Sequence, residues 1–507
     1  MLVFCFASQI QSQSLLFPSD YFFDIQRQQQ VLADTSPVHS SLHPFDYTAY
    51  ETHDSLLYYK ENRSLFSKKL VYDNLLKLDV NDSFAGSTTR FKLSIDPLFN
   101  FQGGMDLADS AHKKLYTNTR GLLVKGGLNN KIKFETAFFE NQSTFPTYIN
   151  NFVLNDSVVP GQGRYKNFKT TGYDYAFASG VISYSPCQNF NLQFGHGKQK
   201  IGNGYRSLLL SDNSFNYPFA RMGAKFFKGK VQYTVIYAAL TNLNSGTKTP
   251  FSEKLFQKKA ASFQYLSWQL HRSLNISFFQ GMMWQAGDNK NQQHIDAGFI
   301  NPVIFTNAAL YGLNNKTNNI VVGGDVQFKI NKTLALYAQW MLDDMKPADG
   351  YSNSGIQAGI KYFDAFSLRN LFIQTEFNRL NNQPYSLAGT GLLYSHYNQN
   401  IAYPLTYANG NEAILISSYN YKRVFASYKL NYFIANNPQD SKYTMLFHDA
   451  RLSYLIHPKT NMNLCMGMNW RTSSQQNIAT NSPEQNSETR FFYISLRTSL
   501  YNVYWDF

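Results

Sequence analysis

Most of this chain alternates apolar and polar residues with a period of two. The alternation is clear from about Thr88 onward, in short runs separated by polar linkers such as 242–249, 288–294 and 473–488. Apolar positions of this kind include Phe91, Leu93 and Ile95; Val231, Tyr233, Val235 and Tyr237; Leu334, Leu336, Ala338 and Trp340; and Leu452, Tyr454 and Ile456. Successive side chains of a strand point to opposite faces, so this period predicts β-strands with one apolar face.

The same pattern limits how the chain can cross a membrane. It contains no run approaching the roughly 18 apolar residues of a membrane-spanning helix. In lipid, only helices and closed barrels satisfy every backbone polar group, so this chain would cross as a barrel. After an N-terminal segment, about 420 residues accommodate roughly 16–18 strands. We therefore predict an all-β fold, a transmembrane antiparallel β-barrel. A soluble sandwich or propeller is the alternative, and no repeat at propeller spacing is present.

The N-terminal residues differ from this pattern. A short apolar run at 2–7 is followed by small residues, so residues 1–14 resemble the tail of a secretory signal peptide. The segment from Ser19 to Leu32 predicts a helix that Ser19 caps. We expect residues 15–85 to form a periplasmic or plug-like segment with this small helix, or else a disordered leader, and residues 86–507 to form the barrel.

The C-terminal residues show the alternation again. Tyr501, Val503, Trp505 and Phe507 alternate with Asn502, Tyr504 and Asp506. Alternation that ends on Phe507 is typical of barrel proteins handed to the outer-membrane barrel-assembly machinery. The sequence therefore predicts a last barrel strand here, with that machinery as a partner through Phe507 and with outer-membrane lipid around the barrel.

The amino-acid composition agrees with a barrel wall that has one apolar face and one polar, water-facing face. Aromatic residues make up 16% of the chain and charged residues also 16%, against roughly 25% charged in soluble domains. The net charge is +13, which favours an anionic partner such as acidic polysaccharide or lipid headgroups. A set of solvated basic loops and lumen residues is the alternative. The basic residues form no dense run, so we do not expect nucleic acid as a partner.

No pattern of reactive or metal-ligating residues indicates an enzyme, a metal site or a cofactor. Of three cysteines, Cys5 falls in the leader, and Cys187 and Cys465 lie far apart. Asp343 and Asp344 are expected to end a strand in a solvated loop. His448 and Asp449 are neighbours on a predicted strand and so point to opposite faces. Nothing resembles a nucleophile motif such as GxSxG.

One stretch, residues 195–221, is unusually rich in glycine and polar residues. Its glycines do not fit a dinucleotide-binding pattern and suit an inward-folded loop. The stretch resembles the Wzi-like capsule-assembly family, in the form found in Bacteroidota that includes the RemB-type gliding motility proteins. The other segments that carry the resemblance are 96–101, 118–121, 139–142, 159–163, 172–176, 301–305 and 395–404. Tyr403 and Leu405 depart from the family pattern.

The resemblance implies an outer-membrane barrel of about 18 strands with a small periplasmic helical portion. It implies a non-enzymatic role in binding or organising capsular or exopolysaccharide, and for the RemB-type branch a part in gliding motility. A diffusion porin or transport channel is the alternative function. An outer-membrane enzyme is a third hypothesis, tested by a hydrolysis assay.

Two groups of polar and aromatic residues are candidates for glycan binding, because amides and carboxylates bond sugar hydroxyls and aromatic rings stack on sugars. The candidates are Tyr205, Arg206, Asp212, Asn213, Asn216 and Arg221 in or beside the glycine-rich stretch, and His396, Tyr397 and Asn398. The alternative is that the first group forms a self-packed constriction loop and the second a network that seals the lumen. Arg206 and Arg221 would then pair with lumen carboxylates such as Asp212.

Overall fold

The structure is a computed structural model. It describes residues 21–34, 39–44, 76–84, 87–109, 114–129, 131–245, 256–286, 297–313, 318–346, 351–382, 385, 392–405, 409–437, 441–457, 460–477, 484–498, 500 and 503–507. The expected signal peptide at 1–14 and most of the expected segment at 15–85 lie outside these residues.

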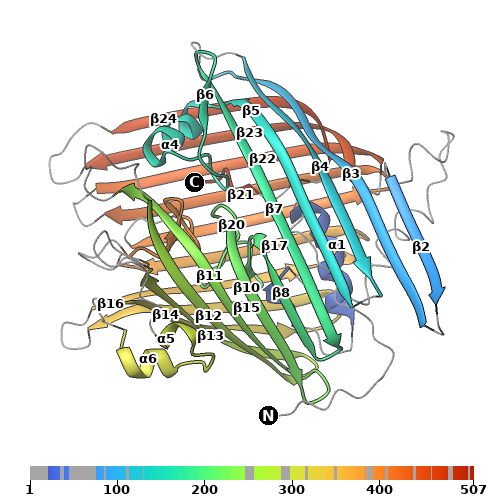
Figure 1. The fold of residues 1–507 in the computed structure, drawn as a ribbon. Helices are drawn as coiled ribbons and strands as arrows, with labels where there is room; N and C mark the ends of the chain where they lie inside the picture. Colours follow the sequence, from blue (N-terminus) through green and yellow to red (C-terminus); the bar gives the residue numbers. More distant parts are fainter. Residues whose placement is uncertain are drawn as a thin grey trace, which may run out of the picture.

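Within the described residues, eighteen antiparallel strands form a closed barrel (Figure 1), which confirms the predicted fold class. These strands are β3 (Ser87–Asp106), β4 (Leu115–Leu128), β5 (Ile132–Thr144), β7 (Gly172–Cys187), β8 (Phe190–Gly197), β10 (Tyr217–Phe226), β11 (Val231–Ser245), β12 (Phe256–His271), β13 (Leu274–Gln285), β14 (Asn318–Lys329), β15 (Leu334–Lys346), β16 (Tyr351–Tyr362), β17 (Leu371–Asn381), β20 (Gly410–Tyr421), β21 (Val424–Asn437), β22 (Ser441–His457), β23 (Met462–Asn477) and β24 (Gln485–Arg497).

The barrel closes where β24 pairs with β3, from Phe491 opposite Asp106 to Arg497 opposite Asn100. β24 pairs with residues 100–106 of β3, and the additional strand β2 (Leu76–Phe84) pairs with the preceding residues 87–95 of β3. This hairpin therefore begins before the expected boundary at residue 86. A short strand β6 (Lys166–Phe168) pairs with β7.

The two ends of the barrel differ in the length of their connections. Turns of a few residues join β4 to β5, β12 to β13 and β20 to β21 at one end, and the long connections, such as 145–171 and 286–317, lie at the other. Outer-membrane barrels have short periplasmic turns and long external loops. We therefore call the two ends the short-turn end and the long-loop end.

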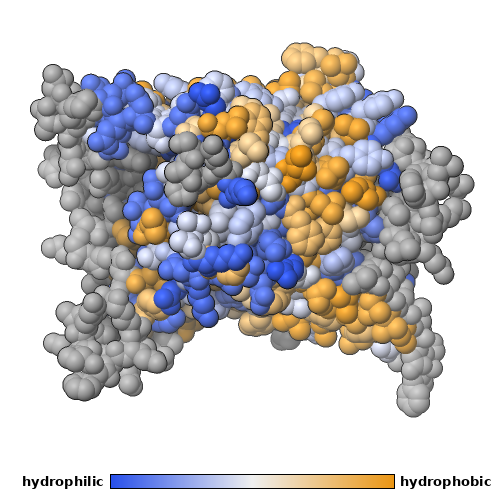
Figure 2. All heavy atoms as spheres, turned by 90° about the horizontal axis from the view of Figure 1, so that it is seen from above, coloured by the Kyte–Doolittle hydropathy of each residue, from blue (hydrophilic) through white to orange (hydrophobic). Residues whose placement is uncertain are grey.

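The period-two pattern separates the two faces of the wall. Side chains that point outward include exposed apolar residues such as Phe138, Trp268, Ile356, Leu452, Met466 and Ile494. Figure 2 shows hydrophobic residues gathered over part of this outer surface, beside hydrophilic ones. Among the described residues, no helix is both long and apolar enough to cross a membrane.

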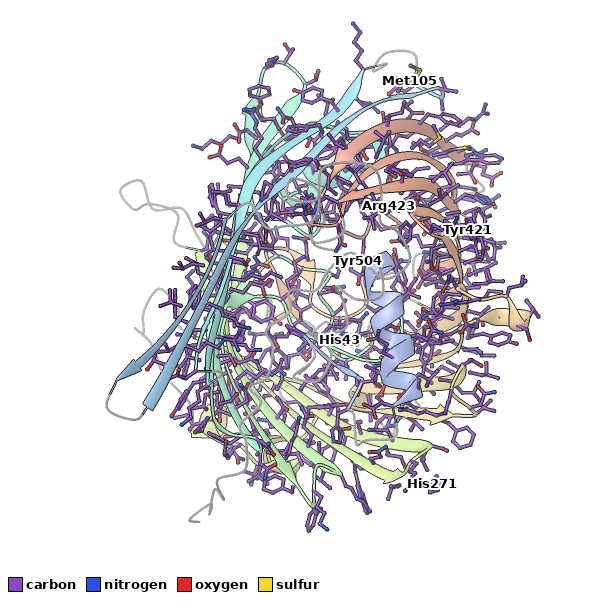
Figure 3. The ribbon with its side chains drawn as sticks, turned by 90° about the vertical axis from the view of Figure 1, so that its right-hand side faces the viewer. His43, Met105, His271, Tyr421, Arg423 and Tyr504 are labelled. Atoms are coloured by element: carbon purple, nitrogen blue, oxygen red, sulfur yellow. The ribbon has the colours of Figure 1, made fainter. Side chains whose placement is uncertain are left out.

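Several segments fill the lumen. The predicted N-terminal helix is α1 (Tyr21–Ala33), which lies inside the ring of strands in Figure 3. Its Gln29 side chain donates to Asp364 Oδ2 at 2.7 Å, next to the short helix η2 (Ala365–Ser367) near the short-turn end. Strand β1 (Leu42–His43) pairs with β9 (Lys200–Ile201), and β18 (Ser395–His396) pairs with β19 (Gln399–Asn400). Helix α4 (Thr147–Asp156) precedes β6 on the chain.

The predicted last strand at 501–507 is wrong. Among the described residues, the last strand is β24, and Val503–Phe507 form no strand; Figure 1 places the C-terminus within the barrel. Tyr504 and Asp506 are buried and contact Asp212 and Arg206 of the glycine-rich stretch. The rings of Trp505 and Phe507 instead pack on the α4 region. The alternation therefore reflects two different lumen surfaces. Recognition of Phe507 by the barrel-assembly machinery stays a prediction.

Candidate functional site

The glycine-rich stretch crosses the lumen between β8 and β10. We call residues 198–216 the plug loop. Gly202 has φ +148° and Gly204 lies against the side chains of Gln357 and Glu376, so a Cβ on either would meet the side chains of the wall. This close approach explains why the loop needs glycine at these two positions. The prediction that this stretch folds inward as a tight loop is confirmed.

Arg206 is the centre of a buried ion-pair network that holds the plug loop. Its guanidinium lies 2.9 Å from Glu412 Oε1 on β20 and 3.3 Å from Asp506 Oδ1 in the C-terminal segment. Lys429 on β21 contacts the same Asp506 carboxylate at 2.9 Å. The backbone amides of residues 205 and 206 donate to Glu376 on β17. One charged side chain thus ties the loop to the wall and to the C-terminal segment.

The charges of this network support one another. Burial alone would raise the pKa of the Asp506 carboxyl, but Arg206 and Lys429 outweigh burial and lower that pKa to about 2. Burial would lower the pKa of Arg206, and Asp506 and Glu412 hold it well above its usual range. Breaking a buried pair by removing one partner leaves an uncompensated charge. The network therefore holds the plug loop as a unit.

A second set of contacts surrounds Asp212. The Tyr504 hydroxyl donates to Asp212 Oδ1 at 2.7 Å. The Lys198 ammonium donates to the backbone carbonyls of Gly161 and Asp212. Burial lowers the pKa of Lys198 to about 8, although Asp212 opposes this shift. These bonds join the plug loop, the segment after α4 and the C-terminal segment.

The two predicted groups of site residues meet at His396. Its Nδ1 accepts from the backbone amide of Thr241, so its Nε2 donates to the Asn216 carbonyl at 3.0 Å. Burial is the main reason that the pKa of His396 falls to about 3, so the ring is neutral. The Asn216 side chain in turn donates to the Ala178 carbonyl of β7.

The remaining candidates contact the same interior. Asn213 donates to the Asn400 carbonyl, and Arg221 on β10 donates to Gln199 Oε1. The Tyr397 ring lies 5.3 Å from that of Phe215. Asn398 donates to the Asp156 carbonyl at the end of α4. The structure thus brings all nine predicted residues into the lumen, but not around one open pocket.

Six of the nine are nearly inaccessible to solvent and bonded to protein groups. Tyr205, Arg206, Asp212, Asn216, Arg221 and His396 are each at most 5% exposed. Their contacts match the alternative of a self-packed constriction loop, with Glu412 and Asp506 as the carboxylates that pair with Arg206. A role for these six in glycan binding stays a prediction.

The plug loop packs on one half of the barrel through apolar contacts. Leu208, Leu209 and Leu210 are fully buried against lumen-facing side chains of β11 to β15, among them Ile236, Phe263, Phe279, Val321 and Met341. Polar lumen-facing residues of these strands also bond the loop, since the Asn203 side chain donates to Asp325 on β14 and the Leu208 amide donates to Gln339 on β15. We call this side the packed half.

The opposite half contains a cavity of about 210 Å³, which we call the lumen chamber. It extends from Ile25 on α1 to Tyr148 on α4, between the C-terminal segment and the wall formed by β3 to β5 and β20 to β24. Its lining includes the aromatic residues Tyr148, Tyr175, Tyr493, Tyr504 and Trp505, the amides Asn100, Asn141, Gln162 and Asn469, and the charged residues Lys429, Asp449, Arg451 and Arg497.

The lumen chamber contains buried polar side-chain atoms that have no hydrogen-bond partner among the described residues. Within the described residues, no hydrogen bond reaches Asn100 Oδ1 or Gln162 Oε1, although both atoms are buried. Arg451 pairs with Asp449, two residues before it on β22, at 2.5 Å. Aromatic faces beside amides and charged groups are suited to a hydroxyl-rich ligand such as a saccharide. Of the nine predicted site residues, Tyr205 alone belongs to this lining. Sequence reasoning missed the other lining residues, because they are dispersed over nine strands, α1, α4 and the C-terminal segment.

Nothing in the geometry of the described residues assembles a metal centre, since no three His, Cys, Asp or Glu residues are grouped there. Asp343 is buried and accepts from the Tyr385 amide at 2.6 Å, so the expectation that it lies in a solvated loop is wrong. His448 stacks on Trp470, whereas Asp449 pairs with Arg451. The two neighbours face opposite sides of the wall, as predicted.

Comparison with known proteins supports the fold. No protein-family model matches the sequence, and neither does any curated protein. Among solved structures, the chain is similar to Wzi of Escherichia coli, described as an outer-membrane protein involved in group 1 capsule assembly and as a carbohydrate-binding β-barrel. The TM-score is 0.55 at 12% identity, over 96% of this chain and 100% of Wzi.

Two further solved structures have lower scores. OccAB2 of Acinetobacter baumannii gives a TM-score of 0.44 at 11% identity, over 80% of this chain and 98% of that one. OccK3 of Pseudomonas aeruginosa gives 0.43 at 11% identity, over 80% and 96%. The likeness to Wzi spans nearly the whole chain, and it shows that this chain has the fold of an outer-membrane barrel.

Proposed function

We propose that this protein is a non-enzymatic outer-membrane barrel that binds surface polysaccharide, capsular or secreted, and helps to organise it at the cell surface. The observation that carries the proposal is the filled lumen. The plug loop, α1 and the C-terminal segment occupy the space that a general diffusion pore leaves open, and buried ion pairs fix the plug loop and the C-terminal segment.

The lumen chamber and the net charge supply the binding chemistry. Aromatic, amide and guanidinium groups line the chamber, and the chain carries a net charge of +13. An anionic polysaccharide fits both features. Wzi, which has the same fold, is described as carbohydrate-binding. Membership of the Bacteroidota form of the family, and a contribution to gliding motility, belong to this proposal and rest on the sequence resemblance; spreading of cells that lack the protein tests the motility role.

The test is binding of the detergent-purified barrel to polysaccharide from its own host, at low and at high salt. We expect binding that weakens as salt rises, because exposed charges are screened over about 8 Å at physiological ionic strength. Absence of binding at both salt concentrations would overturn the proposal.

A transport channel is the second candidate, and one observation favours it. The lumen chamber reaches from α1 near the short-turn end to α4 on the long-loop side, which is the course that a solute path past the plug loop would follow. Single-channel conductance in a planar bilayer separates the two functions. The polysaccharide-binding proposal predicts little steady conductance, whereas a large steady conductance would favour the channel.

A further inference from the structure

A connection from the long-loop end folds over the outside of the barrel. Residues 297–313, which we call the outer flap, include α5 (Ala297–Ile300) and α6 (Thr306–Tyr311). Figure 1 shows both helices outside the ring of strands, beside β12 and β13. The Phe299 ring lies 5.3 Å from that of Tyr237 and 5.5 Å from that of Trp284, and Phe305 lies 6.2 Å from Phe278. All three wall residues point away from the lumen.

The flap covers wall positions that would otherwise be unsuited to lipid. Ser262, Gln264 and Gln280 point outward, because the lumen side of β12 and β13 carries Phe263 and Phe279. Each of the three polar residues is nevertheless fully buried. Val235 and Met282, also outward, are buried too. A polar patch on the outer wall has therefore been shielded by the chain itself.

These polar wall residues satisfy the irregular backbone of the flap. Gln264 donates to the Asn301 carbonyl at 3.1 Å, and Gln280 donates to Gln264 Oε1 and accepts from the Ala308 amide. The hydroxyls of Tyr233 and Tyr237 donate to the carbonyls of Pro302 and Ile300. In water, solvent would satisfy these groups. Unpaired backbone groups are costly in hydrocarbon, where irregular backbone is tolerated if it is buried in protein, and the wall-facing carbonyls of residues 300–302 all have protein partners.

The outer side of the flap is apolar. Residues 297–313 contain no Asp, Glu, Lys or Arg. Ile300, Val303 and Leu310 are 62%, 56% and 70% exposed. On the wall beside the flap, Trp268 and Phe328 are 47% and 45% exposed and also point outward. The exposed apolar surface of the flap thus continues the apolar band of the barrel.

We propose that the outer flap is a lipid-embedded element: it lies against the barrel wall within the membrane, and Ile300, Val303 and Leu310 contact the acyl chains of the outer membrane. The uncharged sequence, the exposed apolar side chains and the bonded backbone together favour acyl chains over water. The inference is independent of polysaccharide binding, because it rests on the outer wall and not on the lumen.

The test places a fluorophore on the flap of the full chain in phosphatidylcholine vesicles. Leu310→Cys is labelled and quenched by lipids with a doxyl group on the acyl chain, and separately by aqueous iodide. Met466→Cys on the outer face of β23 is the lipid-facing control, and Lys228→Cys, which replaces an exposed charged residue in the turn between β10 and β11, is the water-facing control. Labelling of the parent protein, whose Cys187 and Cys465 are buried, sets the background.

We expect the label at position 310 to behave like that at 466, with doxyl quenching several-fold stronger and iodide quenching several-fold weaker than at 228. Val303→Cys should give the same result if Leu310→Cys does not fold. Iodide quenching equal to that at 228 would overturn the proposal, since the flap would then lie in water. Weak quenching by both agents would also overturn it, because a second copy of the chain would then cover the flap.

Discussion

One half of this barrel interior is packed around leucine side chains of the plug loop, whereas the other half contains a cavity. On the packed half, leucines of the plug loop meet apolar side chains of β11 to β15, and little room remains. On the other half, amides, charges and aromatic rings surround the lumen chamber. Apolar packing closes a lumen permanently, whereas a polar, aromatic lining keeps space for a hydrophilic ligand. The difference indicates where a polysaccharide segment would be held.

The largest effect is expected where the ion pairs join the two halves. Glu412→Ala removes the carboxylate beside Arg206 and leaves a buried charge partly uncompensated, which should cost about 4 kcal/mol of unfolding free energy. Urea unfolding of the reconstituted barrel measures it. Glu488→Ala breaks the pair with Arg490, which lies 2.7 Å away at the surface, and should change nothing measurable. Equal losses in both variants would contradict the central role of Arg206.

Packing on the filled half comes next. Leu209→Ala should cost about 3 kcal/mol, because its fully buried side chain leaves a cavity in the plug loop packing. Leu452→Ala, which truncates an outward residue that is 47% exposed, is the matched control and should cost much less. The same urea titration reports both variants, and a Leu209→Ala loss no greater than the control would show that this half is loosely packed.

Acid should loosen the plug loop by a smaller amount. The pKa of buried His396 is about 3, below its usual 6.5, so stabilisation is complete above about pH 6.5 and is lost as the pH falls. From pH 7 to pH 5 this one residue should cost about 2 kcal/mol. His396→Gln cannot take up the proton, so its unfolding free energy should fall less over that interval. An identical pH dependence in variant and parent would exclude His396 as the cause.

The period of two in the sequence predicted the strands of the barrel wall, because alternation there has a single cause: one face of each strand is apolar and points outward, and the other face points into the lumen. It failed at residues 503–507, where an extended segment also alternates but both of its faces lie in the lumen. Trp505 faces the α4 region, and Asp506 faces Arg206. A period of two shows only that the two faces of a segment have different surroundings. It therefore cannot distinguish a strand of the barrel wall from an extended segment inside the lumen.

The candidate site was predicted only in part for a related reason. Glycines and polar residues close together at 195–221 revealed the plug loop. The chamber lining takes one to three residues from each of nine strands, so no single segment of the sequence marks it. Gln264 and Gln280, which interrupt the outward apolar face of β12 and β13, were the available signal for the outer flap.

The most direct test of the account is the affinity of the barrel for its host polysaccharide after a change in the lumen chamber. Trp505→Ala removes an aromatic face from the chamber, and Trp340→Ala removes the same ring from the outer wall, where it is 44% exposed. We predict about a tenfold loss of affinity, about 1.4 kcal/mol, for Trp505→Ala and none for Trp340→Ala. Unchanged affinity in a folded Trp505→Ala barrel would contradict the claim that the chamber holds the glycan.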